Sequence, residues 1–443
     1  MYKEDEWESA PQPNYSVNKN LKYYYSDFPY TEKYKTVPLD GDNTSVKIKI
    51  VDYWGEGRIY DSDIITGFTE SYNVNHQHQV VSNGDDKGSR IPNRIPVKNY
   101  DSLDTTNYIK NDFADYITVM GAPITKSCAD DIRRILNKDN GRVILYGVDD
   151  DSLRNTIDAL KKVGFYSLVK DTLWSPFDQI KLFGDYNVYS FYQEDVFLKR
   201  VSDIINTDYM SGVDILRYIY DTEKDDNYKF LGKVMYWSIS NFSSGLIKCA
   251  HVLHFSNDKK DADLFLQFPK EIRELFDGKD KYIVNGNYYS GGAYSVYLKS
   301  AKNSYADIKV YGGKKELANR FKWTIKTISQ ENTNFFIHNE HQATKNDSYY
   351  LYLSADMDKD GDQQAWVGLI NSDHVPTKKT YQWEIFCMMS PERIYFKFFN
   401  AEYHSKFLKV IENKDGQGDR KAMGSTFLDN VNYKRNWWFF IQA

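Results

Sequence analysis

A glycine loop near residue 55 is the first feature of this 443-residue chain whose residue types and spacing could do chemistry. Asp52, Gly55 and Gly57 follow the apolar segment 46–51, which is typical of a β-strand. A glycine-rich turn after a strand lets the backbone approach a nucleotide-like ligand, which binds at the carboxyl ends of parallel strands. Asp101 could contact the adenine of such a ligand, or it is a solvated turn residue. These four residues are the candidate cofactor-binding residues.

A sugar site is a further candidate, and three sets of residues can be weighed as metal ligands. Asp362 and Trp366 pair an acid with an aromatic ring, as shallow sugar sites do, although Trp366 is alternatively a buried strand residue. The paired histidines 76 and 78 lack a third ligand, and 251 and 254 fit packing or a solvent-facing position better. Aspartates 356, 358, 360 and 362 alternate like calcium ligands, but Val367 replaces the required glutamate, so we predict a solvated hairpin and no metal site.

Four segments would position these residues. Residues 1–44, with prolines among polar residues, indicate an extended arm. In 45–193 short strands alternate with helices, which predicts an α/β domain with a mostly parallel sheet. Apolar residues at helical spacing predict a small all-α domain over 194–280. Residues 281–443 form a strand-rich domain.

This last segment repeats itself three times. Three landmarks recur at steps of 55 to 60 residues: a leucine at 298, 353 and 408; a glycine at 312, 368 and 424; and an aromatic strand at 321–325, 381–385 and 437–441. A period repeated only three times, with turn residues between strands, suits a closed threefold arrangement. We therefore predict a C-terminal β-trefoil, with the tryptophans of the aromatic strands meeting near its axis.

The C-terminal part resembles the lepidopteran 30K lipoprotein family, also called the microvitellogenin family. The resemblance is carried by DQQAW at 362–366, YFKFFNAEY at 395–403 and GDRKA at 418–422, and it covers about 195–443. It implies a helical module followed by a β-trefoil, with storage, lipid-associated, sugar-binding or peptide-binding roles and no catalysis. That family is usually secreted and does not usually carry an α/β domain.

The N-terminal part resembles the class I S-adenosylmethionine-dependent methyltransferases. IVDYWGEGR at 50–58 looks like their first glycine loop, and ADYITVM at 114–120 and NGRVIL at 140–145 follow the order of that Rossmann-type fold. The resemblance implies S-adenosylmethionine as a cofactor, held by the four candidate residues named above.

The groups that methyl transfer requires are missing from this pattern. Tyr53 and Trp54 occupy positions where the family favours small residues, and a bulky ring there could fill the methionine pocket. MGAP at 120–123 supplies no acid, base or amide to orient an acceptor. We therefore expect no catalytic residue and no cofactor, and a degenerate methyltransferase-like domain kept as a scaffold.

Composition limits the partners. The net charge is −5, from 57 Lys and Arg against 62 Asp and Glu, and with no basic stripe nucleic acid is not expected. Neither a signal peptide nor a membrane span is evident, which predicts a cytoplasmic or virion-associated protein. The 37 tyrosines favour protein contacts or self-assembly through Tyr-rich surfaces and the arm, and equally favour strands.

Three hypotheses on function remain. The first is a non-catalytic binding or structural protein, in one form an insect-virus or insect-pathogen assembly protein. The second is an S-adenosylmethionine-dependent methyltransferase that a trefoil delivers to its substrate. The third is a carbohydrate-binding lectin.

Overall fold

The structure is a computed structural model, and it divides the chain into two compact units, Met1–Leu198 and Lys199–Ala443. It describes residues 49–53, 70–76, 94–97, 105–120, 124–139, 141–147, 151–167, 187–222, 229–240, 242–286, 296–300, 307–313, 318–344, 347–359, 361–371, 378–391, 393–403, 406–414, 419–426 and 437–443. The predicted arm, 1–44, lies outside these residues.

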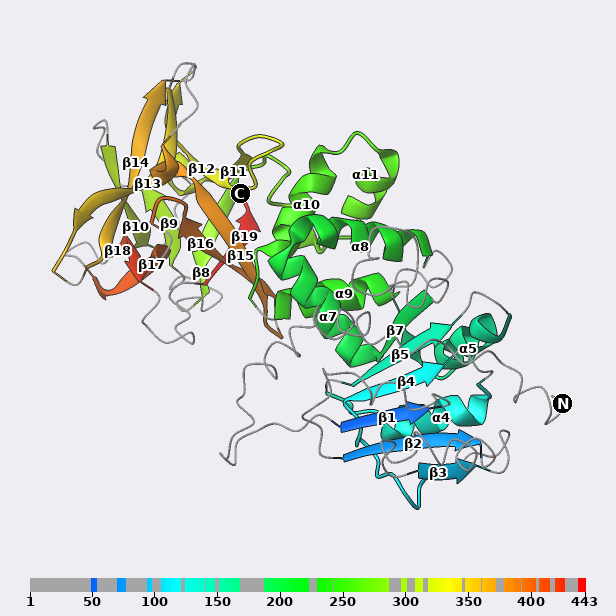
Figure 1. Ribbon diagram of the computed structural model, residues 1–443. Helices are drawn as coiled ribbons and strands as arrows, with labels where there is room; N and C mark the ends of the chain where they lie inside the picture. The colour runs from blue at the N-terminus through cyan, green and yellow to red at the C-terminus, as the bar shows by residue number, and fades with distance from the viewer. Residues whose placement is uncertain are drawn as a thin grey trace. The chain divides into compact units, whose positions relative to one another are not determined.

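A seven-stranded sheet forms the first unit (Figure 1). Its strands, in chain order, are β1 (Lys49–Tyr53), β2 (Glu70–His76), β3 (Arg94–Val97), β4 (Tyr116–Met120), β5 (Arg142–Gly147), β6 (Phe165–Tyr166) and β7 (Asn187–Gln193). Their order across the sheet is β3-β2-β1-β4-β5-β7-β6. The first five are parallel, whereas β7 is antiparallel to both β5 and β6.

Two helices cover the buried face of this sheet. They are α4 (Lys126–Ile135) and α5 (Asp151–Lys162), and each carries apolar residues on one side. The Thr125 hydroxyl begins α4 by accepting a hydrogen bond from the Cys128 backbone N–H at 3.2 Å. Because strand side chains alternate, Val51 and Tyr53 of β1 share the face that packs on these helices.

The predicted Rossmann-type methyltransferase core needs correcting. Within the described residues, the predicted alternation of strands and helices is present only from β4 to α5. Between β1 and β2 and between β2 and β3, no helix falls within the described residues, and the glycine loop lies outside them. The described part of this unit is therefore a mixed seven-stranded sheet with helices α4 and α5, in which a methyltransferase core is not evident.

Helices open the second unit, as the apolar spacing predicted. They are α7 (Glu194–Thr207), within which the boundary between the units falls, α8 (Tyr209–Thr222), α9 (Lys229–Ser240), α10 (Gly245–Phe255), α11 (Lys259–Phe265) and α12 (Lys270–Arg273). The central helix is α10, which contacts α8, α9, α11 and α12. Seven of its eleven residues are buried, so its apolar surface extends almost all round.

One twelve-stranded sheet makes up the rest of the second unit (Figure 1). Its strands are β8 (Lys281–Asn285), β9 (Tyr297–Ser300), β10 (Asp307–Gly313), β11 (Trp323–Thr327), β12 (Phe335–Thr344), β13 (Asp347–Met357), β14 (Gln363–Asn371), β15 (Trp383–Met389), β16 (Ile394–Asn400), β17 (Lys406–Lys414), β18 (Arg420–Thr426) and β19 (Trp438–Gln442). The last strand, β19, pairs with both β8 and β16 and closes the sheet into a barrel. The hairpins β9–β10, β13–β14 and β17–β18 pair with one another.

The aromatic strands of the sequence repeat place three equivalent tryptophans inside this barrel. Trp323, Trp383 and Trp438 are fully buried. Their indole N–H groups donate to the backbone carbonyls of Leu298 (2.8 Å), Leu351 (3.0 Å) and Leu408 (3.0 Å). Each is also the cross-strand partner of a buried asparagine, in the pairs Trp323–Asn339, Trp383–Asn400 and Trp438–Asn285. The repeat thus marks positions that stabilise the interior.

The predicted fold class of this region also needs correcting. The repeat is real, but its twelve strands form one hydrogen-bonded sheet that closes into a β-barrel, and a β-trefoil is not shown. The matching residues identified equivalent strands along the chain. They carried no information on which strands pair, and that pairing determines how the sheet closes.

A short segment before α10 joins the helices to the barrel. Ser243 and Cys387 of β15 exchange two backbone hydrogen bonds of 3.0 and 3.1 Å. The Ser244 hydroxyl donates to Glu384 at 2.9 Å, and Lys248 forms an ion pair with the same carboxylate at 2.5 Å. Helices and barrel therefore share a hydrogen-bonded contact, which the Ser-Ser-Gly segment at 243–245 provides.

Gly245→Ala is expected to weaken this contact. A methyl group at residue 245 would lie 2.1 Å from the Ile205 carbonyl oxygen, and backbone cannot rotate away as a side chain does. We expect the free energy of unfolding to fall by about 1 to 3 kcal/mol, measured by urea denaturation. The control is Gly232→Ala in α9, where nothing lies within 4 Å of the added methyl group, and there we expect a gain of up to about 1 kcal/mol. Equal effects of the two changes would contradict this account.

Candidate functional site

The candidate cofactor-binding residues are only partly described. Gly55, Gly57 and Asp101 lie outside the described residues, as does the side chain of Asp52 at the end of β1. Tyr53, next to Asp52, is described and fully buried. Its ring lies in the core beneath the sheet, and its hydroxyl donates to Asp131 of α4 at 2.7 Å. The bulky residue that could have filled a methionine pocket is therefore part of the core.

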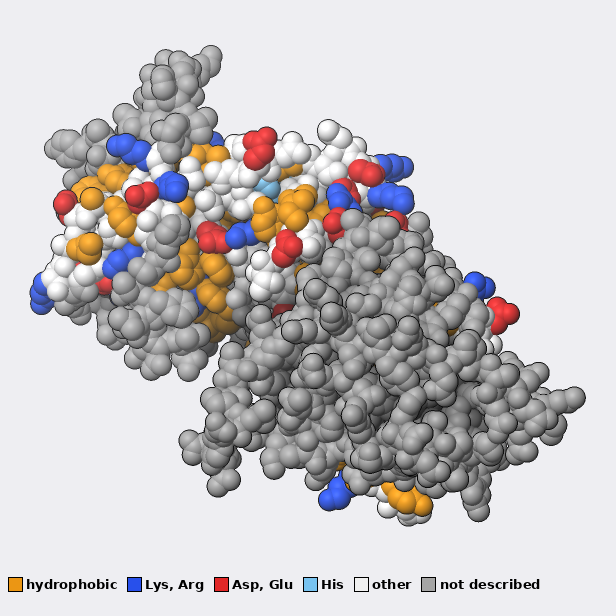
Figure 2. All heavy atoms as spheres, viewed as in Figure 1, with side chains coloured by type: hydrophobic (Ala, Val, Ile, Leu, Met, Phe, Trp, Pro, Cys, Tyr) orange, Lys and Arg blue, Asp and Glu red, His pale blue; other side chains and the backbone are white. Residues whose placement is uncertain are grey.

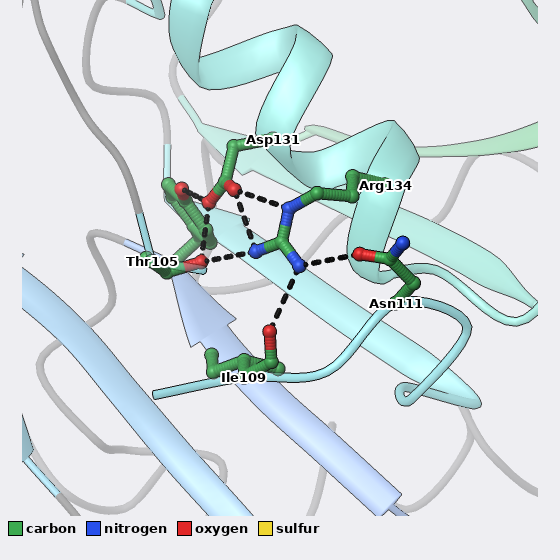
Figure 3. Close-up of polar contacts among 6 residues, drawn as sticks. Thr105, Ile109, Asn111, Asp131 and Arg134 are labelled. Carbon is green, nitrogen blue, oxygen red and sulfur yellow. Dashed lines mark hydrogen bonds and ion pairs between the residues drawn. The ribbon is translucent and has the colours of Figure 1, made fainter. Parts of the chain in front are cut away.

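Asp131 is the centre of a buried polar network (Figure 3). One carboxylate oxygen accepts from the Tyr53 hydroxyl and from the Thr105 hydroxyl, both at 2.7 Å. The other accepts from Arg134 Nε at 3.0 Å and from its Nη2 at 2.8 Å. Burial, and next the Asp131 charge, raise the pKa of the Tyr53 hydroxyl well above its usual value, so this tyrosine stays protonated and remains a donor.

Arg134 uses all five of its N–H donors in the same network. Besides the two bonds to Asp131, its Nη2 donates to Thr105 at 2.8 Å, and its Nη1 donates to the Ile109 carbonyl at 2.8 Å and to Asn111 at 2.9 Å (Figure 3). A guanidinium has five N–H groups, so none is left to bind a ligand. The network ties residues 105–111 to α4, and its role is structural.

The metal candidates form no cluster in the described chain. Among the described residues there is no group of three His, Cys, Asp or Glu side chains that could hold a metal ion. His76 ends β2, and His78 lies outside the described residues. The aspartate-rich segment is a hairpin turn, in which Asp358 N–H donates to the Asp362 carbonyl at 2.8 Å and Gly361 adopts a φ of 75°. This agrees with the predicted hairpin.

The structure places one sugar-binding candidate just before β14 and the other within it. Asp362 precedes β14 and forms an ion pair with Lys409 of β17 at 3.0 Å, with both side chains largely buried. Trp366 lies inside β14 and is half-buried. Four residues of strand span about 13 Å, more than one sugar ring covers. A sugar site that Asp362 and Trp366 form together remains a prediction.

Trp366 lies in an aromatic surface that the sequence did not single out. Its cross-strand partner is Tyr352 of β13, so both rings are on the outer side of the barrel wall. Tyr381 packs on Tyr352 with ring centroids 4.8 Å apart, and all three side chains are half-buried. We call Tyr352, Trp366 and Tyr381 the aromatic face.

Gly368 lies beneath two rings of the aromatic face. A Cβ at this position would lie 2.4 Å from the Tyr381 hydroxyl oxygen and 3.1 Å from a Tyr352 ring carbon, so glycine lets the two rings lie over the strand in this arrangement. This glycine is part of the sequence repeat, but the repeat did not explain why glycine is found there. Figure 2 shows orange hydrophobic side chains interspersed with charged ones on the visible described surface of the second unit.

No protein-family model matches this chain, and no curated protein matches its sequence. Among solved structures it is similar to a mosquitocidal holotoxin, with 15% identity and a TM-score of 0.29 over 38% of this chain and 18% of that one. It is also similar to the botulinum neurotoxin serotype D binding domain (14%, 0.30, over 38% and 42%) and to the Rhizoctonia solani agglutinin (12%, 0.26, over 38% and 97%). This chain thus spans less than a fifth of the holotoxin.

No helix in the described parts of the chain combines the length and the apolar character needed to cross a membrane.

Proposed function

We propose that this protein is a non-catalytic binding protein whose barrel binds carbohydrate on the aromatic face. The observation that carries the proposal is the half-exposed group of Tyr352, Trp366 and Tyr381 on the outer side of β13 and β14. The C–H face of a pyranose ring is apolar and packs on aromatic rings.

The aromatic face is rigid before any ligand arrives. Tyr352 and Trp366 stand on paired strands, and Tyr381 is held over Gly368. Binding then orders few side chains, and each side chain ordered on binding costs about 0.5 to 1.5 kcal/mol. An aromatic surface supported in this way suits a polar ligand with one apolar side.

The polar groups near the other candidate positions support a role without catalysis. Arg134 has no free donor, and the Asp131 carboxylate already accepts four hydrogen bonds. Asp362, the acid closest in sequence to Trp366, is neutralised by Lys409. The resemblance of 195–443 to the 30K lipoproteins stays a prediction, and it adds peptides and lipids as alternative ligands of the same face.

Glycan binding tests the proposal. The intact protein is applied to a glycan array, and the affinity for the strongest free sugar is then measured by calorimetry. Trp366→Ala and Tyr352→Ala should each weaken binding at least about tenfold, since loss of one stacked ring costs about 1.4 kcal/mol or more. Tyr236→Ala, at a tyrosine of α9 that is 55% exposed, is the matched control and should leave the affinity unchanged.

Two outcomes would overturn the proposal. One is an array without binding, and the other is sugar binding that survives Trp366→Ala. Asp362→Asn separates the aromatic face from the pair predicted from sequence, because we expect it to change the affinity less than about twofold. A loss with Asp362→Asn but not with Tyr352→Ala would place the sugar at the ion pair instead.

A further inference from the structure

A histidine without hydrogen bonds lies where the helices meet the barrel. His251 of α10 is fully buried, and neither of its ring nitrogens has a hydrogen-bond partner. Its ring packs on Phe255 (centroids 4.9 Å apart), Phe276 (6.2 Å) and Phe335 (6.3 Å). Phe255 ends α10, Phe276 follows α12 and Phe335 begins β12, so the imidazole is enclosed by both parts of the unit.

This environment tolerates only the neutral ring. Burial lowers the pKa of His251, the neighbouring His254 lowers it further, and the Ser329 backbone acts in the opposite sense without forming a hydrogen bond of normal geometry. A neutral imidazole with unpaired nitrogens is already costly, and an imidazolium among phenylalanine rings costs far more.

Several charged groups on the elements packed around α10 have other partners. They are Arg217 of α8 with Asp214 and Asp261, Glu384 of β15 with Lys248 of α10, and Arg273 of α12 with the Phe268 carbonyl. On α9, Lys233 is exposed, and among the described side chains of β12 the titratable one is His338, whose pKa burial lowers to about 4. Among the described residues, none of these carboxylates is placed to stabilise a protonated His251.

We propose that His251 is an acid-triggered release for the contact between α10 and β12. Below the pKa of free histidine, about 6.5, the open form takes up a proton that the closed form excludes. The contact is therefore at full strength above that pH and weakens as the pH falls below it. The inference is independent of sugar binding, because it concerns the contact between α10 and β12 and rests on a different measurement.

Hydrogen exchange of the full chain tests the release. Exchange is followed by mass spectrometry at pH 7.5 and pH 5.0, corrected for the intrinsic pH dependence of the chemistry. Peptides from 245–256 and 335–344 should exchange at least about tenfold faster at pH 5.0, while those from 394–400 change less than about twofold. His251→Phe should remove the acceleration, because its apolar ring fills the same space and binds no proton.

The control variant is His254→Phe, which changes the exposed neighbour and should keep most of the acceleration. If His251→Phe packs poorly, as slow refolding or fast exchange at pH 7.5 would reveal, His251→Leu takes its place. Equal exchange at the two pH values in the unmodified protein would overturn the proposal. So would an acceleration that persists in both His251 variants, or one that His254→Phe abolishes.

Discussion

Trp383→Ala is expected to lower the free energy of unfolding of the barrel by about 3 to 5 kcal/mol, the usual cost of removing a buried tryptophan. Its indole is fully buried, and the N–H donates to the Leu351 carbonyl at 3.0 Å. Truncation therefore leaves a large cavity together with an interior carbonyl that has lost its donor. Guanidinium denaturation, followed by far-ultraviolet circular dichroism, measures the change.

Two further variants separate the causes. Trp383→Phe keeps most of the apolar volume and removes the N–H, so we expect a smaller loss of about 1 to 3 kcal/mol. Trp366→Ala is the matched control, because this half-buried tryptophan is on the outer side of the barrel, and its effect on stability should be within about 1 kcal/mol. A loss below about 1 kcal/mol for Trp383→Ala would mean that the repeat is not what stabilises the interior.

The sequence repeat revealed the tryptophans of this arrangement but not the residues that pair with them. Tryptophan, leucine and glycine recur at nearly constant steps and were visible, whereas the asparagines that pair with the tryptophans were not. Asn285, Asn339 and Asn400 are separated by 54 and then 61 residues, so loops of unequal length hide the period. Only the strand register shows that each asparagine is opposite a tryptophan. Strand pairing joins residues distant in sequence, and no local pattern contains it.

The direction of the Tyr53 side chain could have been predicted from the sequence. Tyr53 was treated as a group that could block a cofactor pocket, yet it lies two residues after Val51 in a strand, and residues i and i+2 share one face. Since Val51 belongs in the core, strict alternation already predicts that Tyr53 does too. The spacing of Asp131 and Arg134 on a helix likewise permits an ion pair. Thr105 and Ile109 could not be found in that way, because a loop brings them to α4.

Arg134→Met is the second change expected to have a large effect, with a loss of about 3 to 5 kcal/mol in the free energy of unfolding of the first unit. The Asp131 carboxylate would remain buried with hydrogen bonds from Tyr53 and Thr105 but without its cation. Residues 105–111 would also lose the bonds from Nη1 and Nη2 that hold them to α4. Thermal denaturation of the intact chain, with Arg154→Met as control, measures the difference. The control breaks a 3.7 Å pair on the exposed face of α5 and should cost no more than about 0.5 kcal/mol.

A double variant decides whether charge or packing is responsible. If the uncompensated carboxylate is the cause, adding Asp131→Asn to Arg134→Met should recover at least about 1 kcal/mol, because a neutral amide can still accept from Tyr53 and is far less costly to bury. If the lost anchoring of residues 105–111 is the cause, the double variant should be no more stable than the single one. A cost below about 1 kcal/mol for Arg134→Met itself would contradict the conclusion that the hydrogen bonds of Arg134 stabilise the first unit.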